Sequence, residues 1–176
     1  MVEKHVLICG EIGVGKSTLI RKLLDENTRP IGGFITKRIS RRGELPVYIH
    51  PAFQLESERL YTQENLIGTS RDHCFPDVFD HYGVTLLASK QNGLILMDEL
   101  GFMESQAAGF CEAVLRVLDG DVPILAAIKK QDTPFLRAVK MHPNAEVFEI
   151  DRQNRDDLYE RLRPRIRQWN LSVLPD

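Results

Sequence analysis

The sequence has little of several features that would indicate a membrane-bound, secreted or nucleic-acid-binding protein. No apolar run approaches the roughly 20 residues of a membrane-spanning helix, so we expect no membrane partner. The first residues, MVEKHVLICG, show no basic segment followed by an apolar one, so we expect no secretory signal and a cytoplasmic protein. Three cysteines are too few, and odd in number, for a disulfide framework. The net charge of −2 argues against nucleic acid as a partner, and no feature of the sequence indicates a protein partner.

What the sequence does contain fits one globular domain over residues 1–176. The 43% of hydrophobic and 27% of charged residues are ordinary values for such a domain. Basic residues gather in two stretches, over residues 29–42 and 152–167. Runs of this kind are most often solvated faces, and the alternative here is a basic loop that contacts phosphate groups.

The most informative segment is GEIGVGKST at residues 10–18. It fits the pattern G-x-x-x-x-G-K-[ST], the phosphate-binding P-loop motif, at Gly10, Gly15, Lys16 and Ser17. The apolar run HVLIC precedes the motif, and an amphipathic run with helical spacing follows it. A strand, a glycine-rich loop and a helix in this order are the context that the motif requires.

Each residue type in this loop has a chemical reason. Glycines let backbone N–H groups converge on phosphate oxygens, and the helix that starts near Gly15 directs its positive end at the same place. Lys16 supplies a mobile positive charge for the β- and γ-phosphates, and the Ser17 hydroxyl is a hard ligand suited to Mg²⁺. We therefore expect a nucleoside triphosphate as ligand and Mg²⁺ as cofactor. The expected nucleotide-binding residues are Gly10, Glu11, Ile12, Gly13, Val14, Gly15, Lys16, Ser17 and Thr18.

A second candidate segment, GLILMDELGFME at residues 93–104, ends an apolar run in two carboxylates. Carboxylates at the carboxyl end of a buried parallel strand lie on the rim where open α/β sheets bind ligands. Asp98 is the expected Walker B acid and a ligand of Mg²⁺. Glu99 leaves the strand in the opposite direction and can act on a water in line with the γ-phosphate. We expect Glu99 and Lys16 to be the catalytic residues.

Strand and helix patterns alternate along the chain, which predicts an α/β fold with parallel layers. The expected strands are 4–9, 32–40, 46–50, 93–98, 122–128 and 145–150, and the expected helices are 15–26, 76–91, 105–118, 133–140 and 155–169. Residues 36–75 form a less regular, strand-rich insertion, in which Leu60-Tyr61 and Leu66-Ile67 suggest small antiparallel strands. We expect Pro164 to interrupt or kink the last helix.

Further residues are candidates for the same site. Thr36, at the end of a β-rich run, either approaches the site or is an exposed strand threonine. One of Arg38, Arg41 or Arg42 can serve as an arginine finger, in cis or in trans. Asn154 and Arg155 follow the last strand, where the base of a nucleotide is commonly contacted.

With these motifs the chain resembles the small thermophile-type and cancer-related nucleoside-triphosphatases, P-loop proteins that hydrolyse ATP, GTP and other nucleoside triphosphates. The resemblance rests on ICGEIGVGKSTL, GGFITKR, HYGV and MDELGFME, followed in the family's order by PILAAI, TPFLRAVK, AEVFEID and QNRDDL. It implies a RecA-like or AAA-like, mostly parallel sheet flanked by helices, with extra antiparallel strands. It also implies Mg²⁺ dependence and slow turnover with a broad base preference.

Two positions depart from the pattern of this family. Phe102 stands where the family usually has a lysine, and Ala126-Ala127-Ile128 stands where it usually has Gly-Thr-Ile. A hydroxyl at that strand end would sense the γ-phosphate, and an alanine lacks one. Lys129 or Lys130 can substitute, because both lie at the same strand end. The departures concern turnover rather than nucleotide binding.

Three functions are compatible with these residues. The leading hypothesis is Mg²⁺-dependent hydrolysis of ATP, GTP and other nucleoside triphosphates to the diphosphate and phosphate. A small P-loop kinase, with the basic 37–42 loop as a lid, would instead transfer the γ-phosphate to an acceptor. The third is a nucleotide-dependent switch with little turnover, suggested by the missing lysine and threonine.

Overall fold

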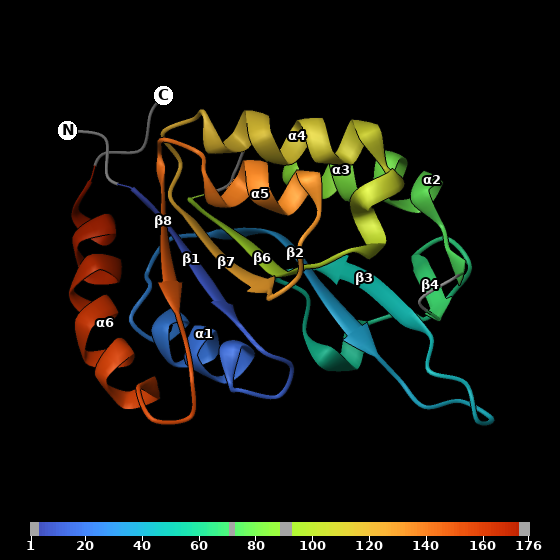
Figure 1. The fold of residues 1–176 in the computed structure, drawn as a ribbon, viewed down its shortest axis with the longest axis horizontal. Coiled ribbons are helices and arrows are strands. Elements are labelled where there is room, and N and C mark those ends of the chain that lie inside the picture. Colours follow the sequence, from blue (N-terminus) through green and yellow to red (C-terminus); the bar gives the residue numbers. More distant parts are fainter. Residues whose placement is uncertain (1–3, 71–72, 89–92, 173–176) are drawn as a thin grey trace.

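The computed structural model describes residues 4–70, 73–88 and 93–172, and its centre is one eight-stranded sheet (Figure 1). The strand order is β5-β4-β3-β2-β6-β7-β1-β8. The five parallel strands are β1 (His5–Gly10), β2 (Ile31–Arg38), β6 (Leu94–Leu100), β7 (Ile124–Lys129) and β8 (Ala145–Glu149). An antiparallel extension follows from β2, made of β3 (Val47–Pro51), β4 (Leu66–Ser70) and β5 (His73–Cys74). The predicted parallel core with extra antiparallel strands is confirmed.

Helices cover both faces of this sheet. One face carries α1 (Lys16–Leu24) and α6 (Arg155–Leu171), which share a hydrophobic cluster with the strands (Figure 1). The other face carries the short α2 (Pro76–Val78) and α3 (Val84–Leu87), together with α4 (Ala108–Leu118) and α5 (Pro134–Lys140). Two 3₁₀ turns, η1 (Glu56–Glu58) and η3 (Met103–Gln106), and one π-helical turn, η2 (Phe79–Gly83), complete the described elements.

The central strands are apolar on both faces because both faces are covered. In β1 every residue is buried, and successive side chains point to opposite sides. Leu7 and Cys9 belong to the cluster under α4 and α5, whereas Val6 and Ile8 belong to the cluster under α1 and α6. This packing fixes the direction in which the chain leaves the strand at Gly10.

The strand order brings the two motifs to one edge of the sheet. β7 lies between β1 and β6. All three strands are parallel, so the ends of β1 and β6 lie at the same rim, separated by one strand. This rim is where open α/β sheets bind their ligands.

Two predictions for the segment between residues 60 and 91 are wrong. Leu60-Tyr61 forms no strand, because the Leu60 carbonyl accepts a hydrogen bond from the Asn65 side chain instead of a neighbouring strand. The helix expected over 76–91 is broken into α2, η2 and α3, and its last residues lie outside the described part of the chain. The π-helical turn coincides with a tight contact, in which Gly83 packs on Phe110 and the Asp80 carboxylate accepts a hydrogen bond from the Phe110 N–H.

The strand predicted at Leu66-Ile67 is confirmed as part of β4. Of the two alternatives at Pro164, the interruption is wrong, because α6 runs through that residue, and the kink stays a prediction. Within the described residues, no helix combines the length and the apolar character that crossing a membrane requires.

Candidate active site

The P-loop segment joins β1 to α1 as the motif requires. Gly15 precedes the first residue of α1 and has φ = 107°, a left-handed conformation that glycine adopts without a steric penalty. A Cβ on Gly15 would lie 3.0 Å from Cδ of Arg155, so the start of α6 packs directly against the loop. A cavity of about 280 Å³ lies at the loop. The residues that line it are Ile12, Gly13, Gly15, Lys16, Ser17, Thr18 and Glu99.

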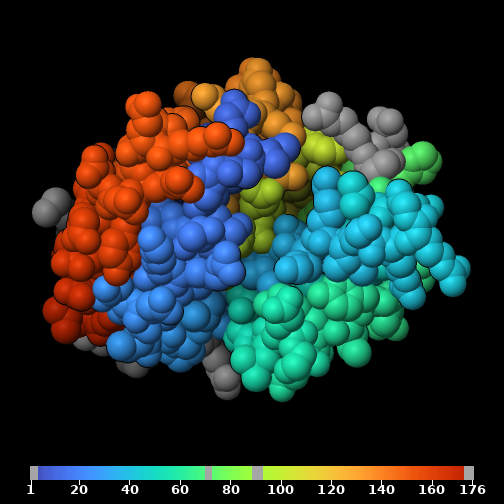
Figure 2. All heavy atoms as spheres, turned by 90° about the horizontal axis from the view of Figure 1, so that it is seen from below, coloured from blue at the N-terminus to red at the C-terminus, as the bar shows by residue number. Residues whose placement is uncertain are grey.

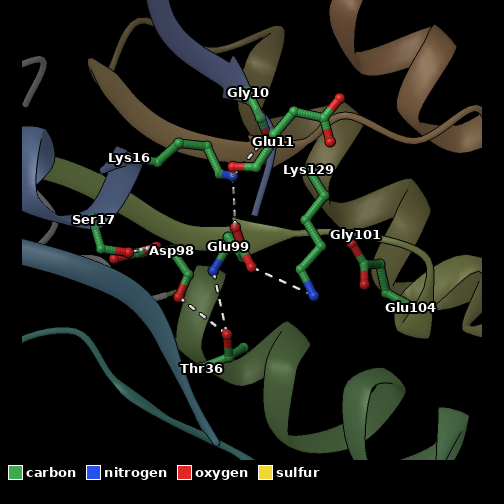
Figure 3. A network of polar contacts seen from close by, with 10 residues as sticks. All are labelled: Gly10, Glu11, Lys16, Ser17, Thr36, Asp98, Glu99, Gly101, Glu104 and Lys129. Carbon is green, nitrogen blue, oxygen red and sulfur yellow. Dashed lines mark hydrogen bonds and ion pairs between the residues drawn. The ribbon is translucent and has the colours of Figure 1, made fainter. Parts of the chain in front are cut away.

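Lys16 is buried and lines this cavity, and polar contacts hold its ammonium group in place (Figure 3). Its Nζ donates hydrogen bonds to the carbonyl oxygens of Gly10 and Glu11, at 2.7 and 2.9 Å. The same Nζ lies 3.7 Å from Oε2 of Glu99, at the end of β6. The positive charge of the P-loop and a carboxylate of the second motif are therefore neighbours.

Asp98, the residue before Glu99, contacts the first helical turn of α1 through Ser17. The Ser17 hydroxyl donates a hydrogen bond of 3.0 Å to Oδ1 of Asp98. Burial raises the pKa of Asp98 to about 6, although the Ser17 hydrogen bond and the charge of Lys16 both oppose that rise. Two hard oxygen donors side by side at a helix N-terminus fit a Mg²⁺ ion, which prefers carboxylate, hydroxyl and phosphate oxygens.

Glu99 lies between two lysines (Figure 3). Lys129, at the end of β7, brings its Nζ to 3.4 Å from Oε1, the oxygen that Lys16 does not contact. The pairing of β6 with β7 shifts register between Asp98 and Leu100, so Glu99 stands at an irregular point of the ladder. Both carboxylate oxygens thus have a cationic partner, which fixes the direction of the group.

Thr36, on β2, holds the backbone that carries the two acids. Its hydroxyl donates to the carbonyl oxygen of Asp98 at 3.3 Å and accepts from the N–H of Glu99 at 3.4 Å. Of the two interpretations of Thr36, the geometry favours the one in which it approaches the site.

Glu104 is a residue near the site to which sequence reasoning gave no role. It is buried, and its Oε1 accepts a short hydrogen bond of 2.5 Å from the N–H of Gly101. Burial raises the pKa of Glu104 to about 7, against smaller opposing contributions from hydrogen bonds and from Lys129. The feature of the sequence that could have indicated Glu104 is its position as the last acid of MDELGFME, six residues after Asp98.

Arg155 and Asn154, the two candidates near the start of α6, differ in what their side chains do. Arg155 lines a crevice of about 290 Å³ that shares Gly15 and Thr18 with the P-loop cavity. Asn154 instead uses its side chain locally, accepting from the N–H of Asp151 and donating to the carbonyl of Glu149. Its amide therefore holds the loop before α6.

At the ends of β2 and β7 the structure distinguishes neighbouring cations. Arg38 is exposed but lines the cavity next to Glu99, whereas Arg41 and Arg42 are exposed in the hairpin turn. Lys129 reaches Glu99, whereas Lys130 is exposed. Ala126 and Ala127 are fully buried in the middle of the sheet, so Lys129 is the polar residue that β7 brings to the site.

Comparison with known sequences agrees with the family resemblance of the motifs. The model of the NTPase family matches residues 5–163 of this chain. The nucleoside-triphosphatase THEP1 of Thermotoga petrophila is 32% identical over 171 residues, which cover 89% of each chain. The nucleoside-triphosphatase THEP1 of Methanocaldococcus jannaschii is 30% identical, over 90% of this chain and 94% of the relative.

Solved structures resemble the fold over nearly the whole chain. The crystal structure of THEP1 from the hyperthermophile Aquifex aeolicus matches with a TM-score of 0.66 at 22% identity, covering 90% of this chain and 96% of that one. The solution structure of a human cancer-related nucleoside triphosphatase matches with a TM-score of 0.65 at 20% identity, covering 94% and 98%. At these identities the likeness concerns the fold.

Proposed function

This chain belongs to the NTPase family and is a nucleoside-triphosphatase, and we propose that it hydrolyses ATP, GTP and other nucleoside triphosphates to the diphosphate and phosphate with Mg²⁺ as cofactor. The observation that carries the proposal is the distance of 3.7 Å between Nζ of Lys16 and the Glu99 carboxylate, across the P-loop cavity. A triphosphate held by the loop would have its γ-phosphate beside these groups. We place the reaction in the cytoplasm, with no membrane or nucleic-acid partner.

The loop and Lys16 would bind the phosphates. Backbone N–H groups at the start of α1 point toward the cavity, and the helix dipole favours negative charge there. The Lys16 ammonium is already positioned by two carbonyl oxygens, so it reaches the β- and γ-phosphates with little loss of side-chain entropy.

Ser17 and Asp98 would hold the Mg²⁺ ion through the oxygens that are now 3.0 Å apart. When bound, the ion neutralises charge on the β- and γ-phosphate oxygens. Thr36 keeps the Asp98 carboxylate in place by its hydrogen bonds to the carbonyl oxygen and the N–H of the Asp98–Glu99 peptide.

Glu99 would act as the general base. A water oxygen attacks the γ-phosphorus, the bond from that phosphorus to the β–γ bridging oxygen breaks, and the water proton goes to the Glu99 carboxylate. The lysine on each side prevents the carboxylate from turning away. Orientation of this kind is worth a large part of a catalytic effect.

The crevice between α1 and α6 would take the base and the ribose. The guanidinium of Arg155 is planar, and a planar cation can stack on the face of any base without reading its edge. This supports a broad base preference.

The test is a panel of phosphate-release rates with ATP, GTP, CTP and UTP, each with Mg²⁺ and with EDTA. We expect comparable rates for the four nucleotides, loss of activity in EDTA, and no activity for Lys16→Ala. Glu99→Gln should lower kcat by about 100-fold or more, as expected for loss of a general base. Glu149→Gln, which changes an exposed acid at the end of β8, is the matched control.

Each part of the proposal has its own contrary outcome. A Glu99→Gln variant within a few-fold of wild-type turnover would remove the base assignment. A preference for one nucleotide by about 100-fold would contradict stacking as the mode of base recognition, and full activity in EDTA would contradict the Mg²⁺ site.

A further inference from the structure

A second cavity lies beside Glu99 and adjoins the P-loop cavity at Glu99 and Ile12. It has a volume of about 250 Å³ and continues outward into a hollow of about 780 Å³ that shares Arg38, Phe102, Met103 and Lys129 with it. Figure 2 shows this side of the molecule hollowed between the blue N-terminal residues and the cyan residues around position 40, with yellow-green residues near position 100 at the bottom. Hydrolysis does not account for a space of this size, because water is the only other reactant.

Glu99 is the charged residue that lines both cavities. It lines the P-loop cavity and also the second one. Oε2 lies near Lys16, a P-loop residue, and Oε1 lies near Lys129, which lines the second cavity. A hydroxyl group bound in the second cavity would therefore lie beside the same carboxylate that faces the γ-phosphate.

The second cavity combines an apolar interior with positive charge. The apolar side chains are those of Ile12, Val47, Ile67, Phe79, Phe102 and Met103. The cations are Lys129, already paired with Glu99, and Arg38, which has no ion-pair partner among the described residues.

The acids on the cavity wall already have partners. Glu99 pairs with two lysines, and Glu104 accepts a hydrogen bond from the N–H of Gly101. The uncompensated charge of the cavity is thus the guanidinium of Arg38, which binds carboxylates and phosphates in a bidentate manner.

We propose that the second cavity binds an organic anion that carries a hydroxyl group, and that this hydroxyl accepts the γ-phosphoryl group of the bound nucleotide. The proposal rests on the nucleotide site and on Glu99 as described under the proposed function. The apolar part of the acceptor lies against Val47 and Phe79, its anionic group binds Arg38, and its hydroxyl lies at Glu99.

The reaction balances without a further reactant. The acceptor oxygen attacks the γ-phosphorus, and the bond from that phosphorus to the β–γ bridging oxygen breaks. The nucleoside diphosphate leaves with that oxygen. The hydroxyl proton goes to Glu99 and then to solvent, so the products are a phosphate monoester, the diphosphate and a proton. Hydrolysis is the same displacement with water in place of the hydroxyl.

The test uses three matched alcohols with [γ-³²P]ATP and Mg²⁺. 4-(Hydroxymethyl)benzoate carries a carboxylate, 4-(hydroxymethyl)phenylphosphonate carries a phosphonate, and 1,4-benzenedimethanol is neutral. The labelled phosphate ester and the labelled phosphate are separated and counted. We expect ester from the anionic alcohols at a rate at least about tenfold above that from the neutral one, and the two anions distinguish a carboxylate from a phosphate acceptor.

The variants assign the effect to the cavity. Arg38→Ala should reduce the preference for the anionic alcohols over the neutral one by about tenfold. Arg41→Ala, which removes an exposed arginine of the same hairpin, is the matched control and should keep the preference.

The outcomes separate this proposal from the proposed function. Phosphate release without any ester from the three alcohols overturns the acceptor site and leaves hydrolysis standing. Ester formation with no difference between anionic and neutral alcohols, or equal behaviour of Arg38→Ala and Arg41→Ala, overturns the anionic class of the acceptor. Absence of both phosphate and ester overturns the proposed function itself.

Discussion

Nζ of Lys129 lies 3.4 Å from Oε1 of Glu99, and the lysine stem reaches that position by passing over Gly101. A Cβ on Gly101 would lie 2.9 Å from Cδ of Lys129, so the absence of a side chain at that residue leaves room for the contact. The direction of the Glu99 carboxylate, the proposed base, therefore depends on Lys129. This residue belongs to β7, which is two strands away from β2, and it lies outside both sequence motifs.

Lys129→Met should lower kcat for phosphate release by about 10- to 100-fold, because a carboxylate held by one lysine instead of two samples unproductive directions. KM for the nucleotide should change little, since Lys129 does not line the P-loop cavity. The measurement is a set of steady-state rates over a range of ATP concentrations.

Lys130→Met is the matched control for this prediction, because it removes the same charge from the exposed neighbour at the same strand end. Equal effects of the two substitutions would mean that the net charge of the strand end, and not the contact with Glu99, determines the rate.

The choice between Lys129 and Lys130 shows what the sequence could not supply. The sequence places both lysines at the end of one strand, and successive residues of a strand point to opposite faces. Which one faces the site depends on the register of β7 against β6, and that ladder shifts between Asp98 and Leu100. The register is a long-range property, so the sequence left both residues open.

Segments whose structure depends on residues close together in the sequence were predicted better, because no long-range contact is needed to specify them. The P-loop residues are contiguous and carry their own turn and helix signals, so β1 and α1 begin and end close to the expected residues. The breaks at Leu60 and within 76–91 arise instead from contacts with Asn65 and Phe110, which lie 5 and more residues away along the chain. Local patterns contain no information about such contacts.

Thr36→Val should reduce turnover by about tenfold and lower the free energy of unfolding by about 1 kcal/mol, because the carbonyl of Asp98 and the N–H of Glu99 both lose a partner. Valine keeps the shape and the β-propensity of the residue, so the loss of the hydroxyl is the main change. Urea unfolding and steady-state kinetics measure the two effects.

Thr36→Ser keeps the hydroxyl and should retain most of the turnover. If the valine variant is as active as the serine variant, the hydroxyl of Thr36 has no part in orienting the carboxylate pair.

Gly15→Ala should abolish tight nucleotide binding. The new Cβ would stand in a left-handed conformation, which costs about 1–2 kcal/mol, and would lie 3.0 Å from Cδ of Arg155, so the Arg155 side chain would have to move away from the loop. Gly43→Ala has the same kind of backbone strain, with φ = 83°, but its Cβ would meet nothing within 4 Å.

Both glycine variants should lose similar stability in urea, and only Gly15→Ala should lose affinity for a fluorescent ATP analogue. If Gly15→Ala binds the analogue as tightly as Gly43→Ala does, the close packing of Arg155 on the loop is dispensable for nucleotide binding.

Glu104→Gln should change how stability depends on pH. In the folded protein the pKa of Glu104 is raised from 4.5 to about 7 by burial. Between these pH values the unfolded chain loses the proton and the folded chain keeps it, so a rising pH favours unfolding. The wild type is thus free of this cost below pH 4.5, loses stability as the pH rises toward 7, and bears the full cost above it.

Glutamine does not titrate, and its amide oxygen can still accept the hydrogen bond from Gly101. As the pH rises from 4.5 to 8, the unfolding free energy of the Glu104→Gln variant should therefore increase relative to that of the wild type by on the order of 3 kcal/mol. Asp98, whose pKa is also raised, titrates in both proteins, so its contribution cancels in the difference. Urea unfolding at pH 5, 6, 7 and 8 gives the curve, with Glu112→Gln on the exposed face of α4 as control. A wild-type minus variant difference that stays flat over this range, as the control should, would mean that the Glu104 carboxyl is already ionised at pH 5 and that the hydrogen bond from Gly101 outweighs its burial.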